Sequence, residues 1–446
     1  MINTEEKTGL KERLVARFYD LEKQLNGQAR THIHSLRRSA LKRFEAIGFP
    51  NPRQEEWKYT NLRTLLEQDF QPVTAVHDED ITLEDIREFF IPEADADRLV
   101  FLNGWFSPKL SVIKDTAHVT VKPLSDAAEE NPERIEEHFK AGSEGNEAFI
   151  LLNTAYAIEG AYIHVPDGKN IEKPVHLLYI NSHEDGPALA QPRTIIKVGG
   201  NSQVTLVESF HSITPQQACT NIFTEFDMAE GANVDYYKIQ HENESSYHIG
   251  TTKVHQERNS TFASNTITLG GRLTRNNIDI KLNGEGCNSR FFGLFITRDK
   301  QHVDNHSLVT HASPGCFSNQ LYKGVLFDRS VGVFDGRIIV EPAAQKTNAF
   351  QSNKNILMSD AASINSKPQL EIYADDVKCS HGATMGQQDE DAVFYLQTRG
   401  IDRLQAKALL NLAFVNDIVE QVKIASLKDR INEWVHERLD QPKSEL

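Results

Sequence analysis

The chain has 446 residues and a formal net charge of −15, from 63 acidic and 48 basic residues. Such a charge balance argues against a nucleic-acid surface, which would need a basic patch. The length is greater than one compact core usually supports, so we expect two or three structural units. Apolar runs stay below the roughly 20 residues that cross a bilayer, so we expect no membrane association.

Sequence motifs of several enzyme classes are absent. The pair Gly168-Lys169 is followed by Asn170 rather than Ser or Thr, and no GxGxxG opens a helix after a strand, so we expect this chain to bind no nucleotide. GxSxG, HExxH and CxxC are also missing. The segment Met1–Gly9 is polar and does not form the apolar core of a secretory signal, which favours a cytoplasmic protein.

The N-terminal part of the chain has helical periodicity. Residues Thr4–Leu25 predict an amphipathic helix and Thr31–Ala46 a second one. A loop dense in Trp, Tyr and charge follows at Asn51–Asn61, and Leu62–Phe70 predicts another helix. The apolar stripe of the first helix consists of Leu10, Leu14, Phe18, Leu21 and Leu25. We therefore expect an N-terminal helical region over residues 1–70.

Residues 71–160 alternate short helical and strand-like segments. Within them, Arg98–Phe106 predicts a strand followed by a turn. We interpret residues 71–160 as a small mixed α/β section.

Residues 161–385 have the pattern of successive strands. Polar or glycine-containing turns punctuate this region about every 27 residues on average. The turns begin at Gly199, Gly231, Asn259, Gly284, Ser313, Asp328 and Ser359. In segments such as Gln203–Glu208, apolar and polar residues alternate, as they do in a strand with one buried face. Propeller blades are longer, and a sandwich would not need so regular a repeat, so we expect a β-solenoid with two or three strands per turn.

The chain becomes helical again over residues 386–446. Asp389 or Asp391 caps a first helix, Asp402 begins a second, and Ser426 caps a third. The predicted inward stripe of the second helix is Leu404, Ala408, Leu412, Val415, Ile418 and Val422. That of the third is Leu427, Ile431, Val435 and Leu439. We expect these helices to form a C-terminal domain.

The sequence Cys379-Ser380-His381 carries the strongest chemical signal in the chain. In an extended segment, positions i and i+2 point to the same side, so Cys379 and His381 would project together. Thiolate and imidazole suit zinc, copper(I) and iron–sulfur centres. Two ligands do not close a coordination shell, so other groups from this chain or another would have to complete it. The alternative interpretation is a space-filling thiol and a histidine satisfied by a backbone carbonyl.

Other His and Cys residues favour structural roles. His302, His306 and His311 lie near Cys316, but their spacings suit neither a helical zinc pair nor one face of a strand. Cys287 and Cys316 follow turns at equivalent places in the repeat, which indicates packing positions. The four cysteines are scattered, and a disulfide scaffold is not expected at this length.

Three blocks of the chain resemble the SufB/SufD family of iron–sulfur cluster assembly proteins, and within it the SufD side. The first block reads Gln-Glu-Glu-Trp-Lys-Tyr-Thr-Asn and the third begins Cys-Ser-His-Gly-Ala-Thr. The blocks comprise Pro50–Asn61, then Tyr322–Val325, Phe334–Ile338 and Gln351–Leu357, and finally Cys379–Thr384 with Phe394–Ile401. Together they extend over nearly the whole chain.

The resemblance implies a right-handed parallel β-helix flanked by N- and C-terminal helical domains, in agreement with the solenoid expected from the turn spacing. It implies a scaffold subunit rather than an enzyme, pairing with SufB and binding the SufC ATPase through its C-terminal helices. A transient iron–sulfur cluster, shared with SufB, would form at the interface of the pair. His381 matches the family's cluster histidine, and Cys379 is the second candidate metal ligand. ATP hydrolysis by SufC would twist the pair by a hinge-type motion.

Two alternatives remain at this point. SufB-like chains tend to be longer, have a histidine–glutamate pair where this chain has His381-Gly382, and lack the Glu-Glu-Trp-Lys-Tyr-Thr block. A carbohydrate-active β-helix enzyme would need paired carboxylates facing a groove, but Asp375 and Asp376 are adjacent and should point to opposite sides of a strand. A homodimer of the isolated chain is compatible with an exposed solenoid edge.

Overall fold

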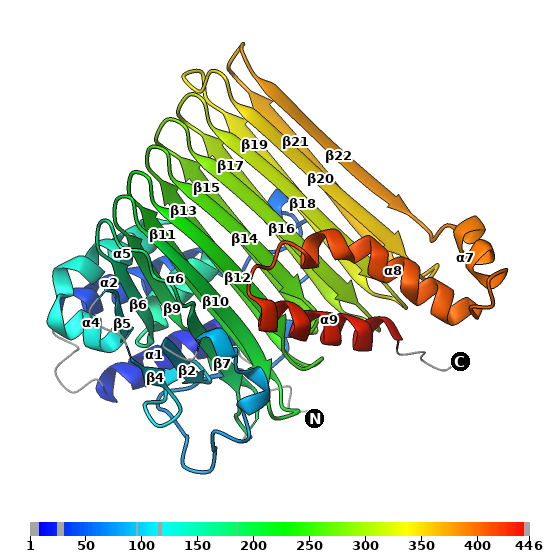
Figure 1. Cartoon of the computed structure of the whole chain (residues 1–446). Helices are drawn as coiled ribbons and strands as arrows, with labels where there is room; N and C mark the ends of the chain where they lie inside the picture. The colour runs from blue at the N-terminus through cyan, green and yellow to red at the C-terminus, as the bar shows by residue number, and fades with distance from the viewer. Residues whose placement is uncertain (1–8, 25–30, 95–96, 115–117, 185, 441–446) are drawn as a thin grey trace.

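The computed structural model describes residues 9–24, 31–94, 97–114, 118–184 and 186–440. Two long β-sheets face each other along most of the chain and form the walls of a solenoid (Figure 1). Helices lie at both ends of the chain. The expected mainly β fold, with a parallel β-helix core and helical flanks, is confirmed.

The strands of the two sheets alternate along the chain. In spatial order the first sheet contains β21 (Ser363–Ile372), β19 (Val331–Val340), β17 (His302–His311), β15 (Leu273–Leu282), β13 (Tyr247–Gln256), β11 (Ala218–Met228), β9 (Arg193–Val198), β6 (Gly160–Val165) and β5 (Thr120–Pro123), with β1 (Gln71–Pro72) and β8 (Ala188–Ala190) beside them. The second contains β22 (Lys378–Gly386), β20 (Asn348–Leu357), β18 (Phe317–Leu326), β16 (Asn288–Thr297), β14 (Thr261–Thr268), β12 (Asn233–His241), β10 (Gln203–Ser212), β7 (Val175–Asn181), β2 (Asp97–Leu102) and β3 (Trp105–Phe106), with β4 (Val112–Ile113) paired to β2. One strand from each sheet therefore makes one turn.

Each solenoid strand pairs in parallel with the strand two places further along the chain. The chain passes from Gln203 to Lys378 in six such turns of about 29 residues each, close to the repeat read from the turn sequences. At the corners, Asn201, Gly231 and Asn259 have φ angles of 53°, 70° and 55°. Only Gly, Asn and Asp adopt this left-handed region at low cost, which explains why these residues mark the turns.

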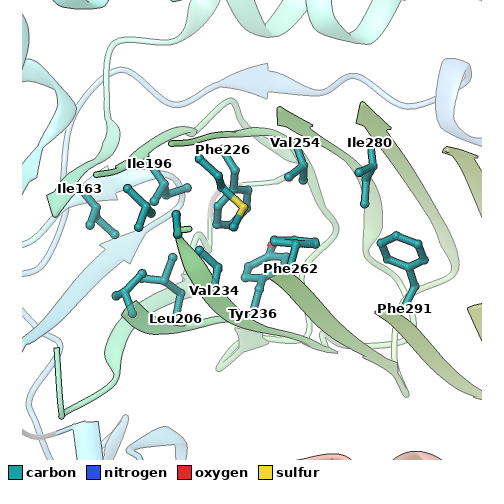
Figure 2. Packing of buried hydrophobic residues seen from close by; sticks show 14 of the residues in the cluster. Ile163, Ile196, Leu206, Phe226, Val234, Tyr236, Val254, Phe262, Ile280 and Phe291 are labelled. Atoms are coloured by element: carbon teal, nitrogen blue, oxygen red, sulfur yellow. The ribbon is translucent and has the colours of Figure 1, made fainter. Parts of the chain in front are cut away.

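The interior between the two sheets is filled by apolar side chains. Alternate residues of each strand point inward, as Figure 2 shows for Leu206 and Val234 of one sheet and Ile196 and Val254 of the other. Aromatic rings meet at the centre: the ring of Phe226 lies 5.1 Å from that of Tyr236 and 5.2 Å from that of Phe262. These separations are typical of favourable edge-to-face packing.

N-terminal helices cover the outer face of the first sheet. They are α1 (Leu10–Gln24), α2 (His32–Ile47), α3 (Arg63–Leu66), α4 (Leu124–Glu130), α5 (Pro132–Glu144) and α6 (Ala148–Tyr156), with the short 3₁₀ turn η2 (Glu55–Trp57). Two further 3₁₀ turns, η3 (Arg87–Phe89) and η4 (Pro92–Ala94), lie on the side of the second sheet, where Phe89 packs with residues of β2 and β7. Leu10, Leu14 and Phe18 of α1 are buried in one cluster with Tyr247 and Ile249 of β13. The predicted stripe of the first helix is thus an inward face; Leu25 lies outside the described residues.

C-terminal helices cover the outer face of the second sheet (Figure 1). The covering helices are α8 (Arg403–Val419) and α9 (Ala425–Asp440), and α7 (Glu390–Gln397) contacts α8 beyond the edge of the sheet. Asp389 caps α7 and Asp402 caps α8, as predicted. All four predicted inward residues of α9 are buried. None of the described helices is both long and apolar enough to cross a membrane.

Residues 71–160 contribute strands to both sheets. β2 pairs with β7 in the second sheet, and β5 pairs with β6 in the first. The strand and turn predicted over Arg98–Phe106 are present as β2, a bend at Asn103-Gly104, and β3. This section therefore closes the N-terminal end of the solenoid.

Three local predictions were wrong. Of Leu62–Phe70 only Arg63–Leu66 is α-helical, because no side chain caps its start and β1 begins at Gln71. Ser426 does not cap α9 but lies inside it, and its backbone N–H donates to the carboxylate of Glu93 at 3.0 Å. Leu404 is not inward-facing: its side chain is 67% exposed.

Candidate functional site

The last turn of the solenoid is open. In the described part of the chain β22 pairs with β20 on one side only, and β21 is likewise the end strand of the first sheet. Figure 1 shows both strands at the end of the solenoid remote from the N-terminal helices. Edge strands of this kind present unpaired backbone N–H and C=O groups to an incoming strand.

Cys379 and His381 lie on β22 in this open turn. In the parallel register Cys379 is opposite Ala349 and His381 is opposite Gln351. Both partners are buried in the interior, whereas Phe350 between them faces out. Cys379 and His381 therefore continue the inward face of the sheet, beyond the last turn that is covered on both sides.

The environments of the two side chains differ. Cys379 is half-buried and packs against the apolar core, whereas His381 is exposed. Burial raises the pKa of the Cys379 thiol, and a hydrogen bond with the backbone of Ala349 offsets part of this rise. The thiol is therefore protonated at neutral pH.

The pair does not make a complete metal site by itself. Among the described residues, no three His, Cys, Asp or Glu side chains are grouped so that they could hold a metal ion. A soft centre needs further thiolate or imidazole ligands. The geometry places a thiol and an imidazole side by side on the inward face of an open end strand.

Apolar side chains surround this open end. Tyr373, which follows β21, is 62% exposed, and Met385 of β22 is 57% exposed. Phe350 of β20 and Ile372 of β21 are also exposed. A protein surface that combines open strand edges with exposed apolar side chains is typical of an interaction site.

A second apolar surface lies on the C-terminal helices. Phe394 and Tyr395 of α7 are 67% and 58% exposed, and Leu404 and Leu409 of α8 are exposed as well. The other half of α8 is fixed to the solenoid, where the Nζ of Lys323 bonds the carbonyl oxygen of Phe414 at 2.6 Å. Sequence reasoning missed this surface because it assigned Leu404 to the inward stripe. The sequence does not signal it, because Leu404 shares its stripe with the buried Val415.

The three histidines of β17 do not form a metal cluster. The Nε2 of His306 lies 2.9 Å from a carboxylate oxygen of Asp304, and His302 bonds the hydroxyl of Thr60. His311 points inward and bonds Ser318. Each of the three histidines has a hydrogen-bond or ion-pair partner within the protein.

Two other sequence features have clear places in the structure. The buried thiols of Cys287 and Cys316 belong to the solenoid core, as predicted. Asp375 and Asp376 lie in the loop between β21 and β22 and not in a strand. The expected placement of their carboxylates on opposite sides of a strand is therefore wrong.

The tryptophan-containing loop joins the N-terminal region to the solenoid. The hydroxyl of Thr60 donates to Asp304 at 2.5 Å, and Arg275 bonds both the carbonyl oxygen of Glu56 and Asp304. The ring of Trp57 stacks on that of Phe149, 5.5 Å between centroids. This block therefore holds the N-terminal helices in place.

Comparison with known proteins identifies the family. Residues 179–414 match the SufBD core domain of the SUF system for FeS cluster assembly, and residues 9–177 match the SufBD protein N-terminal region. The chain belongs to the SufBD family. It is 35% identical to an iron–sulfur cluster assembly SufBD family protein of Synechocystis over 90% of this chain and 89% of that one. It is 30% identical to the iron–sulfur cluster assembly protein SufD of Escherichia coli over 92% of both chains.

The SufBD family match covers both structural parts described above. The N-terminal match contains the Trp57 loop and the first strands, and the core match contains most of the solenoid and much of α8. The family assignment therefore connects the chain with iron–sulfur cluster assembly and agrees with the resemblance seen in the sequence.

Proposed function

We propose that the chain is a scaffold subunit of an iron–sulfur cluster assembly complex. It pairs through the open end of its solenoid with SufB, binds the SufC ATPase through its C-terminal helices, and helps to build a nascent cluster where the two solenoids meet. The observation that carries the proposal is the position of Cys379 and His381 in an uncovered last turn. The cluster is cargo passed onward and is shared with SufB.

Pairing at the open end is supported by backbone and side-chain features together. The end strands β21 and β22 offer ladders of unpaired backbone groups to a partner strand. Tyr373 and Met385 supply apolar area beside them. A SufB solenoid joined here would bring its own side chains next to His381, which is how a two-ligand set acquires its remaining ligands. An isolated chain uses the same end to form a homodimer.

Attachment of SufC is supported by the C-terminal helices. Exposed apolar side chains lie on α7 and on the first half of α8, while the second half of α8 is bonded to β18 through Lys323. A partner that moves α7 and α8 would therefore transmit force to the sheet that ends in β22. No catalytic step on an organic substrate, and no nucleotide binding, is assigned to this chain; we place the complex in the cytoplasm.

The partner assignment is tested by co-purification with the cognate SufB and SufC chains. Replacing Leu404 by Asp together with Phe394→Asp should abolish SufC recovery and leave SufB pairing intact. Leu83→Asp is the matched control, because Leu83 is 47% exposed outside the C-terminal helices. Retention of SufC by the double variant would contradict the proposal.

The ligand assignment is tested by reconstitution of the complex with iron and sulfide. His381→Ala should reduce cluster formation, read as iron and sulfide per complex, without loss of either partner. Cys379→Ala should reduce it less. His255→Ala is the control, because His255 is an exposed histidine on the outer face of β13. Normal cluster formation by His381→Ala would mean that His381 is not a ligand.

A further inference from the structure

Two consecutive turns of the solenoid carry a thiol at the same position. Cys287 and Cys316 immediately precede β16 and β18, whose first residues, Asn288 and Phe317, are paired. The backbone N–H of Phe317 donates to the carbonyl of Cys287 at 2.8 Å, so the two cysteines are direct neighbours. Both Sγ atoms contact one carbonyl oxygen, that of Gly284, at 3.2 and 3.3 Å.

The adjoining turns have a hydroxyl at this position. Ser260 precedes β14 and Thr347 precedes β20, and each hydroxyl donates to the carbonyl three residues earlier, at 2.6 and 2.8 Å. The thiol of Cys287 makes the equivalent contact at 3.2 Å. The turn therefore needs a small hydrogen-bonding side chain, which Ser or Thr supplies better than the weakly donating Cys. The turn itself does not explain two successive sulfur atoms.

The thiol pair lies beneath exposed turn residues, and Cys287 also contacts the carbonyl oxygen of Glu257 in the preceding turn. Cys287 and Cys316 are buried, but Glu285, Pro314 and Gly315 of the turns above them are exposed. The adjacent Cys316 thiol lowers the pKa of Cys287. The Cys287 thiol in turn raises the pKa of Cys316. Of the two thiols, Cys287 is therefore the one that loses its proton more readily.

We propose that Cys287 and Cys316 are a redox-active thiol pair, which a hydroperoxide oxidises to a disulfide joining two turns of the solenoid. Paired strands lie about 4.8 Å apart, within the range of about 4.4–6.8 Å between Cα atoms that a disulfide bridges. The remaining pair of cysteines lies elsewhere: Cys219 is under the N-terminal helices and Cys379 is in the open turn.

The reaction needs one equivalent of hydroperoxide. The Cys287 thiolate attacks one peroxide oxygen, the O–O bond breaks, and the other oxygen leaves as an alcohol or water after protonation. Cys316 then attacks the sulfur of the resulting sulfenic acid, forming the S–S bond and releasing water with its own proton. Two thiols are oxidised by two electrons, and the peroxide is reduced by the same two electrons.

The experiment uses the full chain and hydrogen peroxide, which is little larger than water. After oxidation the protein is denatured, free thiols are alkylated, and tryptic peptides are analysed by mass spectrometry. We expect a linked peptide pair containing Cys287 and Cys316, at the mass of the two peptides less two hydrogen atoms, and its loss on treatment with a dithiol reductant. Cys219 should remain fully alkylated, because its partners on the neighbouring strands are Leu189 and Tyr247 and not a second thiol.

Serine variants separate the two thiols without disturbing the turn, since Ser260 shows that a hydroxyl fits there. Cys316→Ser should stop at a sulfenic acid on Cys287 that dimedone traps. Cys287→Ser should leave Cys316 unmodified. The proposal would be overturned if both thiols were fully alkylated after peroxide treatment. Separate oxidation of each thiol, without a linked peptide, would also overturn it.

Discussion

The guanidinium of Arg275 lies over the indole of Trp57, with its Cζ 3.8 Å from the ring centroid. The same guanidinium pairs with the buried carboxylate of Asp304 at 2.6 Å. Arg275 therefore connects a loop of the N-terminal region with two neighbouring strands of the solenoid. The planar, many-donor side chain of arginine can stack and hydrogen-bond at once, which lysine cannot do.

Replacing Arg275 by Met should destabilise the protein by about 3–5 kcal/mol, because it leaves the charge of Asp304 buried without its partner. Urea unfolding would measure the loss. Limited proteolysis should show faster cleavage in residues 51–61, which lose their attachment to the sheet. Arg275→Lys keeps the charge but not the stacking, so its loss of unfolding free energy should be intermediate. Wild-type stability of both variants would show that other contacts hold the loop.

The buried pair Arg193–Glu225 should make stability depend on acid pH. Burial would raise the pKa of Glu225, but the charge of Arg193, 2.6 Å away, outweighs it and lowers the pKa to about 2. A depressed folded-state pKa contributes stability above the unfolded value near 4.5, and this contribution is lost as the pH falls toward 2.

The comparison that tests this pair is the parent protein against Glu225→Gln. The parent should be more stable by about 3 kcal/mol at neutral pH. This difference should shrink steadily between pH 4.5 and 2, as followed by denaturant unfolding at each pH. A difference that does not change with pH would mean that Glu225 titrates normally.

Core and end-of-solenoid aromatics should respond differently to truncation. Phe262 is fully buried between the two sheets, so Phe262→Ala should cost about 3–5 kcal/mol in the free energy of unfolding. Phe350 is 36% exposed at the open end, so Phe350→Ala should cost much less. Equilibrium urea unfolding of both variants gives the comparison. Similar losses would indicate that the open end is covered in the isolated chain, as a homodimer would cover it.

The solenoid could be predicted because every turn meets the same backbone requirement. Positions such as Asn201 and Asn259 must take up a left-handed conformation, so the turn residues repeat in the sequence as they do in space. The position of α8 could not be predicted in the same way. Leu404 and Val415 share a stripe of the helix, but only Val415 is buried against the sheet. Which turns of a helix lie over a sheet depends on tertiary packing.

The candidate site was predictable in part for a related reason. Strand alternation indicates that Cys379 and His381 lie on one side of β22, and the register confirms this arrangement. Their exposure depends on where the last turn of the solenoid stops, which the local sequence does not encode. The equivalent repeat positions of Cys287 and Cys316 predict packing residues. Only the comparison with Ser260 shows that a thiol occupies a position where another turn has a hydroxyl.

The junction between α8 and the solenoid should depend on Lys323. Its ammonium is almost fully buried and bonds both the carboxylate of Asp417 and the carbonyl oxygen of Phe414, each at 2.6 Å. Lys323→Met removes both bonds but keeps most of the apolar stem, so α8 should be held less tightly by about 1–3 kcal/mol. Hydrogen exchange of the amides in residues 403–419 should become faster while exchange in the solenoid interior stays unchanged. Lys354→Met, on the exposed face of β20, is the control and should leave both unchanged. Unaltered protection of α8 in Lys323→Met would show that apolar contacts alone fix the helix to the sheet.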